Sequence, residues 1–93
     1  MIGEYVLIRS RDAGVFMGIM KKISGDVVEL EDSRRLWRWR GANTLNEVST
    51  GGSPGTGTRI SEPIVRHVIL GVIEVLFPTP NARKDLENSR WED

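Results

Sequence analysis

The first forty residues alternate between short β-branched or aromatic segments and tight turns, and this pattern restricts the fold more than any other feature. The connections Arg11–Gly14 and Ser24–Asp26 hold glycine and aspartate, which favour turns. Connections this short join antiparallel neighbours, so the region predicts a meander of three or four strands. Strands are predicted where valine, isoleucine, leucine and aromatic residues concentrate, at residues 4–10, 15–23, 27–31 and 34–40.

Two positions are expected to disturb this meander. Gly18 lies inside the second strand, where a glycine indicates a bulge or a sharp bend. Asp32 and Ser33 separate the third segment from the arginine-rich fourth one, and we expect a brief interruption of the strand there.

The pattern changes after Gly41, where a short helix is predicted. Thr44 and Glu47 have the spacing of a capping box, in which each side chain bonds the other residue's backbone N–H. Leu45 and Val48 then share one face. Glycines 51 and 52 end the helix after one or two turns, and residues 49–58 are expected to form a mobile loop, since none of them can anchor a core.

Residues 64–77 are the most apolar stretch, and their valine and isoleucine content favours strand over helix. Gly71 is expected to bend this stretch or divide it into two strands, and Pro78 to end it. Thr79 followed by Pro80 is typical of a helix start. The polar tail 81–93 predicts a short, loosely ordered helix with Ala82 and Leu86 on one side.

These elements predict a single domain over residues 1–93 of a mainly β class, that is, a β-rich α+β fold. We expect a small SH3-like barrel or a curved antiparallel sheet of five to six strands. One short helix follows the tryptophan-containing strand, and a second helix at the C-terminus completes the fold.

Composition excludes several classes of function. The chain has no cysteine, which rules out disulfides and thiolate metal sites. Its single histidine, His67, is too few for a histidine-rich metal site, and no nucleophile-elbow motif of a serine triad lies near it. We therefore expect no enzyme activity, no metal and no cofactor. No apolar run reaches the roughly 20 residues that span a bilayer, so we expect a cytoplasmic protein without membrane contact.

Charge is balanced in number but uneven in kind and place. Thirteen basic residues equal thirteen acidic ones, yet ten of the basic residues are arginine. Arginine carries a planar fork that binds phosphate through two parallel hydrogen bonds and stacks on rings. Four arginines fall within seven residues, at Arg34, Arg35, Arg38 and Arg40. The nearby acids Glu29, Glu31 and Asp32 are alternative partners for them across a neighbouring strand.

Alternation along residues 34–40 places these side chains on two faces. Arg34, Leu36, Arg38 and Arg40 share one parity, and Arg35, Trp37 and Trp39 share the other. In a structural interpretation the tryptophans belong to the core and the arginines face water. In a functional interpretation the arginines bind phosphates while an indole stacks on a base. A mixed interpretation keeps Trp37 in the core.

The functional interpretation gives a set of candidate ligand-binding residues. The arginines contact phosphate groups, Trp37 or Trp39 stacks on a ring, and Thr58 and Arg59 donate from a loop that closes over the ligand. The alternative for the loop is a plain linker, and His67 in its apolar strand is expected to be a packed residue. The full set is Arg34, Arg35, Trp37, Arg38, Trp39, Arg40, Thr58 and Arg59.

The run Arg34-Arg35-Leu36-Trp37-Arg38-Trp39-Arg40-Gly41-Ala42 resembles a motif, Arg-Arg-x-Trp-x-Trp-x-Gly-Ala, of small, largely uncharacterised proteins of tailed bacteriophages. The opening segment 5–9 and the segment 13–18 extend the resemblance, which covers most of residues 4–80. The resemblance implies a phage accessory protein that is made in the bacterial cytoplasm and has no assigned catalytic residues.

From the residues and the resemblance together we predict a protein that binds and sequesters an anionic nucleotide ligand, a cyclic nucleotide immune signal among the candidates, and so counters host defence. A homo-oligomer is expected, because a shared pocket buries more ligand than one small chain can. One alternative is a protein–protein inhibitor of a host enzyme or a phage structural accessory. Another is single-stranded nucleic-acid binding, which the zero net charge disfavours.

Overall fold

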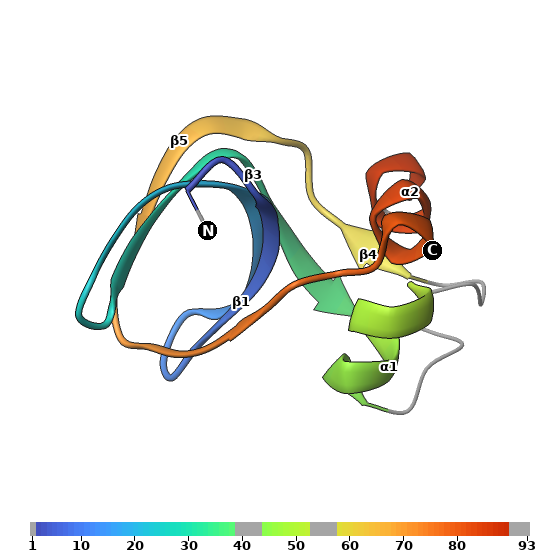
Figure 1. Ribbon diagram of the computed structural model, residues 1–93, viewed down its shortest axis with the longest axis horizontal. Coiled ribbons are helices and arrows are strands. Elements are labelled where there is room, and N and C mark those ends of the chain that lie inside the picture. The colour runs from blue at the N-terminus through green and yellow to red at the C-terminus, as the bar shows by residue number, and fades with distance from the viewer. Residues whose placement is uncertain (1, 39–43, 53–57, 90–93) are drawn as a thin grey trace.

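The computed structural model describes residues 2–38, 44–52 and 58–89, which form a curved antiparallel sheet and two helices (Figure 1). The mainly β class predicted from the sequence is confirmed. The elements in chain order are β1 (Tyr5–Ser10), β2 (Gly14–Ser24), β3 (Val27–Arg38), α1 (Leu45–Gly51), β4 (Arg59–Ile60), β5 (Ile64–Ile69), β6 (Val72–Leu76) and α2 (Pro80–Asn88).

The strand order among the described residues is β4-β3-β2-β1-β6, with β5 also paired to β3. The long strand β3 serves two partners: its first half pairs with β5, from Val28 opposite Ile69 to Ser33 opposite Ile64. Its second half pairs with β4, where Leu36 lies opposite Ile60. Figure 1 shows the resulting sheet curling back on itself, with β5 and β6 joined through a short bend.

The bend of β3 comes from a bulge opposite Gly18. Asp32 has a φ of 54°, a left-handed conformation in which aspartate is tolerated better than most residues. The register between β2 and β3 shifts between Met17 and Ile19 at the same place. A Cβ on Gly18 would lie 2.9 Å from the Glu31 carbonyl oxygen, so only glycine lets the two backbones approach this closely. The bulge expected at Gly18 is therefore present, and β3 bends through residues 32 and 33 without ending.

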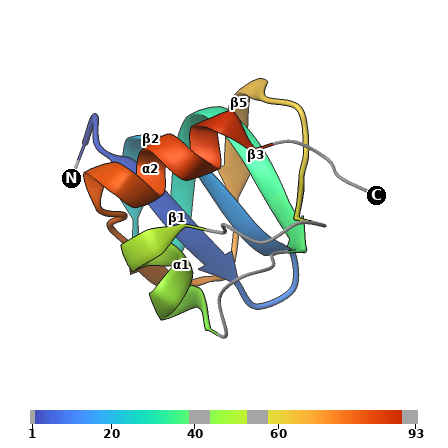
Figure 2. The ribbon, with the colours of Figure 1, turned by 90° about the vertical axis from the view of Figure 1, so that its right-hand side faces the viewer.

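Two apolar cores lie on opposite faces of the sheet. The curvature encloses the first core, and the two helices cover the second, on the side that faces the viewer in Figure 2. Both faces of β1 are buried, which explains its continuous apolar sequence. The first core contains Val6, Ile8, Phe16, Met20, Val28, Leu30 and Ile69, and the second contains Leu7, Met17, Leu36, Leu45, Val48, Ile60 and Leu86.

Helix α1 begins as the sequence predicts. The Thr44 hydroxyl accepts a hydrogen bond from the Glu47 backbone N–H at 3.2 Å, and Leu45 and Val48 are buried. The helix ends at Gly51, and Gly52 follows it with a φ of 76°. Of the loop predicted at 49–58, residues 49–51 belong to α1, while residues 53–57 lie outside the described residues.

Helix α2 is more ordered than the sequence suggests. The Thr79 hydroxyl accepts from the Ala82 backbone N–H at 3.1 Å and Pro80 opens the helix, as predicted. However, Ala82 and Leu86 are completely buried, so packing against the sheet stabilises a segment that its own polarity leaves marginal. Residues 90–93 of the predicted tail lie outside the described part of the chain. Neither described helix has the length and apolar character that a bilayer crossing requires.

Candidate ligand-binding site

The two adjacent arginines of β3 send their side chains to opposite faces of the sheet. Arg34 points to the helical face, where its guanidinium donates to four backbone carbonyls. The distances are 2.8 Å from Nε to Ser61, 3.1 and 3.3 Å from Nη1 to Leu86 and Glu87, and 2.6 Å from Nη2 to Ser89. This cation therefore caps the C-terminal end of α2, where its positive charge also interacts favourably with the negative end of the helix dipole.

Burial lowers the pKa of Arg34, and the nearby Tyr5 and Glu87 act in the opposite sense. The guanidinium nevertheless stays charged, because arginine does not lose its proton in proteins. Most of its donors are committed to backbone oxygens of this chain. The phosphate-binding role predicted for Arg34 is therefore not the one its geometry serves, and we place it in the framework of the fold.

Arg35 lies on the other face of β3 and keeps its guanidinium available. Its Cζ is 4.8 Å from the centroid of the Phe16 ring, a cation–π contact that holds the fork in place. Its backbone N–H donates to the Ser61 hydroxyl at 2.7 Å. Among the described residues, its side chain forms no hydrogen bond and no ion pair. Arg35 is thus an exposed cation that is oriented but not neutralised.

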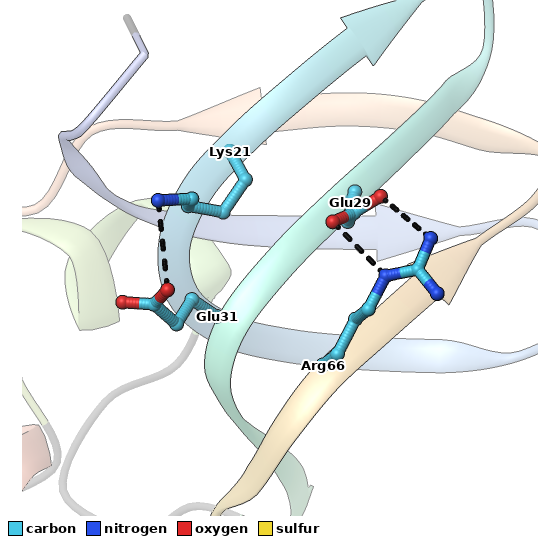
Figure 3. A network of polar contacts seen from close by, with 4 residues as sticks. All are labelled: Lys21, Glu29, Glu31 and Arg66. Carbon is cyan, nitrogen blue, oxygen red and sulfur yellow. Dashed lines mark hydrogen bonds and ion pairs between the residues drawn. The ribbon is translucent and has the colours of Figure 1, made fainter.

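Two of the three acids that were alternative partners for the arginines, Glu29 and Glu31, pair elsewhere. Arg66 of β5 contacts both carboxylate oxygens of Glu29, at 3.1 and 3.2 Å, and Lys21 of β2 lies 3.5 Å from Glu31 (Figure 3). The contact with Arg66 lowers the pKa of Glu29. These pairs lie on the outer surface of β2, β3 and β5, so they leave Arg35 without a carboxylate partner.

His67 of β5 lies beside Arg35 at the mouth of the first core. Its ring meets the edge of Phe16 at a centroid distance of 4.8 Å and an interplanar angle of 89°. Its Nδ1 is 3.0 Å from the hydroxyl oxygen of Ser33, a residue that is only 1% exposed. Burial, and secondly the charge of Arg35, lower the pKa of His67, so the ring is neutral at neutral pH. The packed role expected for this histidine fits these contacts.

A pocket of about 360 Å³ opens between these side chains. Arg35 and His67 line it together with the buried ring of Phe16 and the polar side chains of Ser61 and Glu62. This volume lies at the lower end of the range of pockets that hold small ligands. The pocket brings together one unpaired cation, a neutral imidazole and apolar surface.

Trp37 and Arg59 extend this face beyond the pocket. Trp37 is 57% exposed, so the interpretation that placed it in the core is wrong. Arg59 of β4 stacks on its ring, with Cζ 5.2 Å from the centroid. Trp37 follows Arg35 by two residues, about 7 Å along the strand. Both residues are exposed, and the register between β3 and β4 shifts between Leu36 and Arg38. The three residues form a surface of cations and an exposed indole, which we call the Arg35–Trp37 face.

Among the remaining residues of the predicted set, Thr58 does not add to this face. Thr58 is only 1% exposed, so its hydroxyl does not reach the surface. Trp39, Arg40 and the side chain of Arg38 lie outside the described residues. Sequence reasoning missed Phe16 and His67 as members of the site, because strand pairing brings together residues 16, 35 and 67 from three separate segments.

Comparison with known proteins identifies one family. The profile of a family described as a domain of unknown function (DUF6948) matches residues 3–86, a range that includes every residue of the pocket and of the Arg35–Trp37 face. Neither the curated proteins nor the solved structures contain a match. The resemblance to phage proteins and its motif stay predictions from the sequence.

Proposed function

The chain belongs to the DUF6948 family, and from the geometry of its site we propose that it binds an anionic, ring-bearing ligand of the nucleotide type without transforming it. The phosphate of the ligand pairs with Arg35 at the pocket mouth, and the base stacks on Trp37. The proposed function is the one predicted from the sequence, but the binding residues differ from the predicted set. The residues that carry it are Arg35, Trp37 and Arg59, with His67 beside them, in place of the whole arginine run.

The unneutralised guanidinium of Arg35 is the observation that carries the proposal. A cation held against Phe16 at the mouth of a pocket, with its fork open, is prepared for a bidentate contact with an oxyanion. The exposed indole of Trp37, two residues further along β3, supplies a stacking surface of the kind that nucleotide bases use. The hydroxyl nearest to His67 belongs to the buried Ser33, which favours binding over nucleophilic chemistry.

Sequestration of a nucleotide signal, in a phage protein that counters host defence in the bacterial cytoplasm, is the biological role we attach to this proposal. It rests on the sequence resemblance. Such a role requires tight binding of the ligand without its transformation. Both requirements agree with a cationic, stacking site in which the hydroxyl bonded to the imidazole belongs to the buried Ser33.

Isothermal titration calorimetry with mononucleotides and with cyclic di- and oligonucleotides tests the proposal. At least one of them binds to the wild-type chain, and Arg35→Ala weakens its affinity by about 10- to 100-fold, the usual effect of losing hydrogen bonds to a charged group. The matched control is Arg9→Ala, which removes an exposed arginine on β1 that pairs with Glu74 at 3.9 Å. The control leaves binding unchanged.

Two results would overturn the proposal. One is the absence of binding heat with every nucleotide in the series. The other is equal loss of affinity in Arg35→Ala and Arg9→Ala, which indicates attraction by general charge only. Chromatography of the ligand after prolonged incubation with the protein tests whether the ligand is bound without being transformed. A hydrolysed product contradicts that part of the proposal.

A homo-oligomer belongs to the proposal for a separate reason. Among the described strands β5 pairs only with β3, and it presents exposed aliphatic side chains beside that unpaired edge. Val65 is 78% exposed and Leu70 is 65% exposed, and an apolar edge strand of this kind favours pairing with a second chain. Sedimentation velocity tests it: the wild-type chain sediments as an oligomer and Val65→Lys as a monomer. A wild-type monomer at high concentration rejects the homo-oligomer.

A further inference from the structure

A second cavity, of about 500 Å³, lies on the helical face of the sheet. It is separate from the pocket beside Arg35, because Arg34 lines this cavity and Arg35 lines the other, and the two residues point to opposite sides of β3. Its walls come from β1, from the bulge in β3 and from the C-terminal half of α2. The nucleotide site proposed above makes no use of it.

Three charged groups of this cavity already have partners within the chain. Arg34 donates to the backbone carbonyls at the end of α2. Arg83 lies 3.3 Å from the Glu87 carboxylate and stacks on the Tyr5 ring, with its Cζ 4.9 Å from the centroid. These contacts build a rigid wall with nearly balanced charge, so the cavity does not attract ligands by net charge.

Besides the exposed Asn88 amide, two polar groups of the cavity have no partner among the described residues. The Tyr5 hydroxyl oxygen is buried and forms no hydrogen bond within the described part of the chain, which leaves a donor unsatisfied at a considerable energetic cost. Burial raises the pKa of Tyr5 well above its usual range, so the hydroxyl keeps its proton. The exposed Asp32 carboxylate likewise forms no hydrogen bond or ion pair with the described residues.

These two groups make opposite demands on a ligand. The Tyr5 hydroxyl, with two guanidinium groups nearby that only donate, needs an acceptor. The exposed Asp32 carboxylate is hydrated, and a cationic donor is the group that it binds best. A single anion binds the Tyr5 hydroxyl but not the Asp32 carboxylate, and a single cation binds the carboxylate but not the hydroxyl.

We propose that this cavity is a binding site for a small zwitterion of the amino-acid type, whose carboxylate accepts from Tyr5 and whose ammonium group pairs with Asp32. The balanced charge of the walls suits a ligand with no net charge. The unpaired hydroxyl and the unpaired carboxylate fix its orientation.

Ligand-observed NMR on the full chain tests the site with glycine, β-alanine, γ-aminobutyrate and leucine as probes. This series varies the separation of the charged groups and the size of the side chain. At least one zwitterion binds, and acetate and methylammonium, which each carry half of its chemistry, bind at least tenfold more weakly. Absence of binding by every zwitterion, or equal binding by the half-ligands, overturns the proposal.

Two conservative variants locate the binding. Tyr5→Phe removes only the unpaired hydroxyl, and Asp32→Asn removes the charge while keeping a residue that tolerates the positive φ. Each weakens the affinity for the best zwitterion by about tenfold. Asp26→Asn, in the exposed turn between β2 and β3, is the matched control and leaves affinity unchanged. Undiminished affinity in Tyr5→Phe and Asp32→Asn places binding elsewhere and overturns the site.

The two proposals fail independently. Arg35→Ala leaves zwitterion binding unchanged, since its side chain is on the opposite face of β3, and Tyr5→Phe leaves nucleotide binding unchanged. Loss of zwitterion affinity in Arg35→Ala contradicts the separation of the two sites.

Discussion

The guanidinium of Arg34 donates to the carbonyl oxygen of Ser89 at 2.6 Å, and this bond joins the middle of β3 to the residue that ends α2. The contact is one of four that the same side chain makes to backbone oxygens. Helix ends leave carbonyls without intrahelical partners, and an arginine fork satisfies several of them together. The arginine-rich run therefore includes at least one residue that stabilises the fold.

Substitution of Arg34 by methionine is expected to lower the free energy of unfolding by about 2 kcal/mol. The estimate reflects the loss of charge-assisted hydrogen bonds at a partly buried site, part of which water replaces. Urea denaturation followed by circular dichroism measures it. Arg35→Met is the matched control and costs less than about 1 kcal/mol, because it removes only a cation–π contact. Equal losses in the two variants would contradict the capping role.

Gly18 leads to a second prediction about stability. A Cβ at this position meets the Glu31 carbonyl oxygen at 2.9 Å and the Ser33 Cα at 3.2 Å, and both are backbone atoms that move only with the strand. Gly18→Ala is therefore expected to lower the free energy of unfolding by about 2 kcal/mol, within the usual range for overpacking.

Gly51→Ala provides the control for Gly18. A Cβ at Gly51 meets nothing within 4 Å, and the residue has no positive φ. At the end of α1, alanine is expected to be neutral or to stabilise by up to about 1 kcal/mol. Chemical denaturation of both variants under one set of conditions gives the comparison, and a neutral Gly18→Ala would mean that β2 and β3 separate easily at the bulge.

Local sequence signals predicted most of the fold, because they act within a few residues. Thr44 and Thr79 cap their helices as their spacing indicates, and the strands of the meander follow the β-branched segments. The order of α2 was underestimated, since it depends on the burial of Ala82 and Leu86 against the sheet. Such a contact between distant segments leaves no mark in local polarity.

The site was predicted in part for the same reason. Alternation correctly separated Arg34 from Arg35, but it did not indicate which face the helices cover. Arg34, which belongs to the parity with more arginines, points toward α2, while Arg35 and Trp37 face outward. The joining of Phe16 and His67 to Arg35 depends on strand register and on the bulge, and neither is fixed by the composition of one segment.

The cap of α2 leads to a third prediction, because Thr79 has two roles. Its hydroxyl accepts from the Ala82 N–H and donates to the Thr50 carbonyl at 2.6 Å, which links the two helices. Thr44 only caps its own helix. We expect Thr79→Ala to cost about 2 kcal/mol of unfolding free energy and Thr44→Ala about 1 kcal/mol, the usual cost of a lost cap. Denaturation curves of the two variants test this order, and the reverse order would contradict the link.

The last prediction concerns pH and follows from the charge of Arg35, which lines the same pocket as His67. The pKa of His67 is lowered from its ordinary value of 6.5, by burial first and by the charge of Arg35 second. In the unfolded chain the histidine takes up a proton near 6.5, and in the folded chain it does so only at lower pH. Between these two pKa values the unfolded state binds more protons, so the free energy of unfolding falls as the pH drops below 6.5.

Two variants separate His67 from the carboxylates that titrate at lower pH. His67→Asn removes the titrating ring but keeps a polar group toward Ser33, and it should lose less stability than the wild type when the pH falls through this window. Arg35→Ala should raise the pKa of His67 toward 6.5, because it removes the neighbouring cation while burial remains. Titration of the His67 ring signals by NMR measures the pKa of His67 in the wild type and in Arg35→Ala. An unchanged pKa in Arg35→Ala would show that the guanidinium does not act on the ring, and a nucleotide phosphate bound at Arg35 should raise that pKa in the wild type.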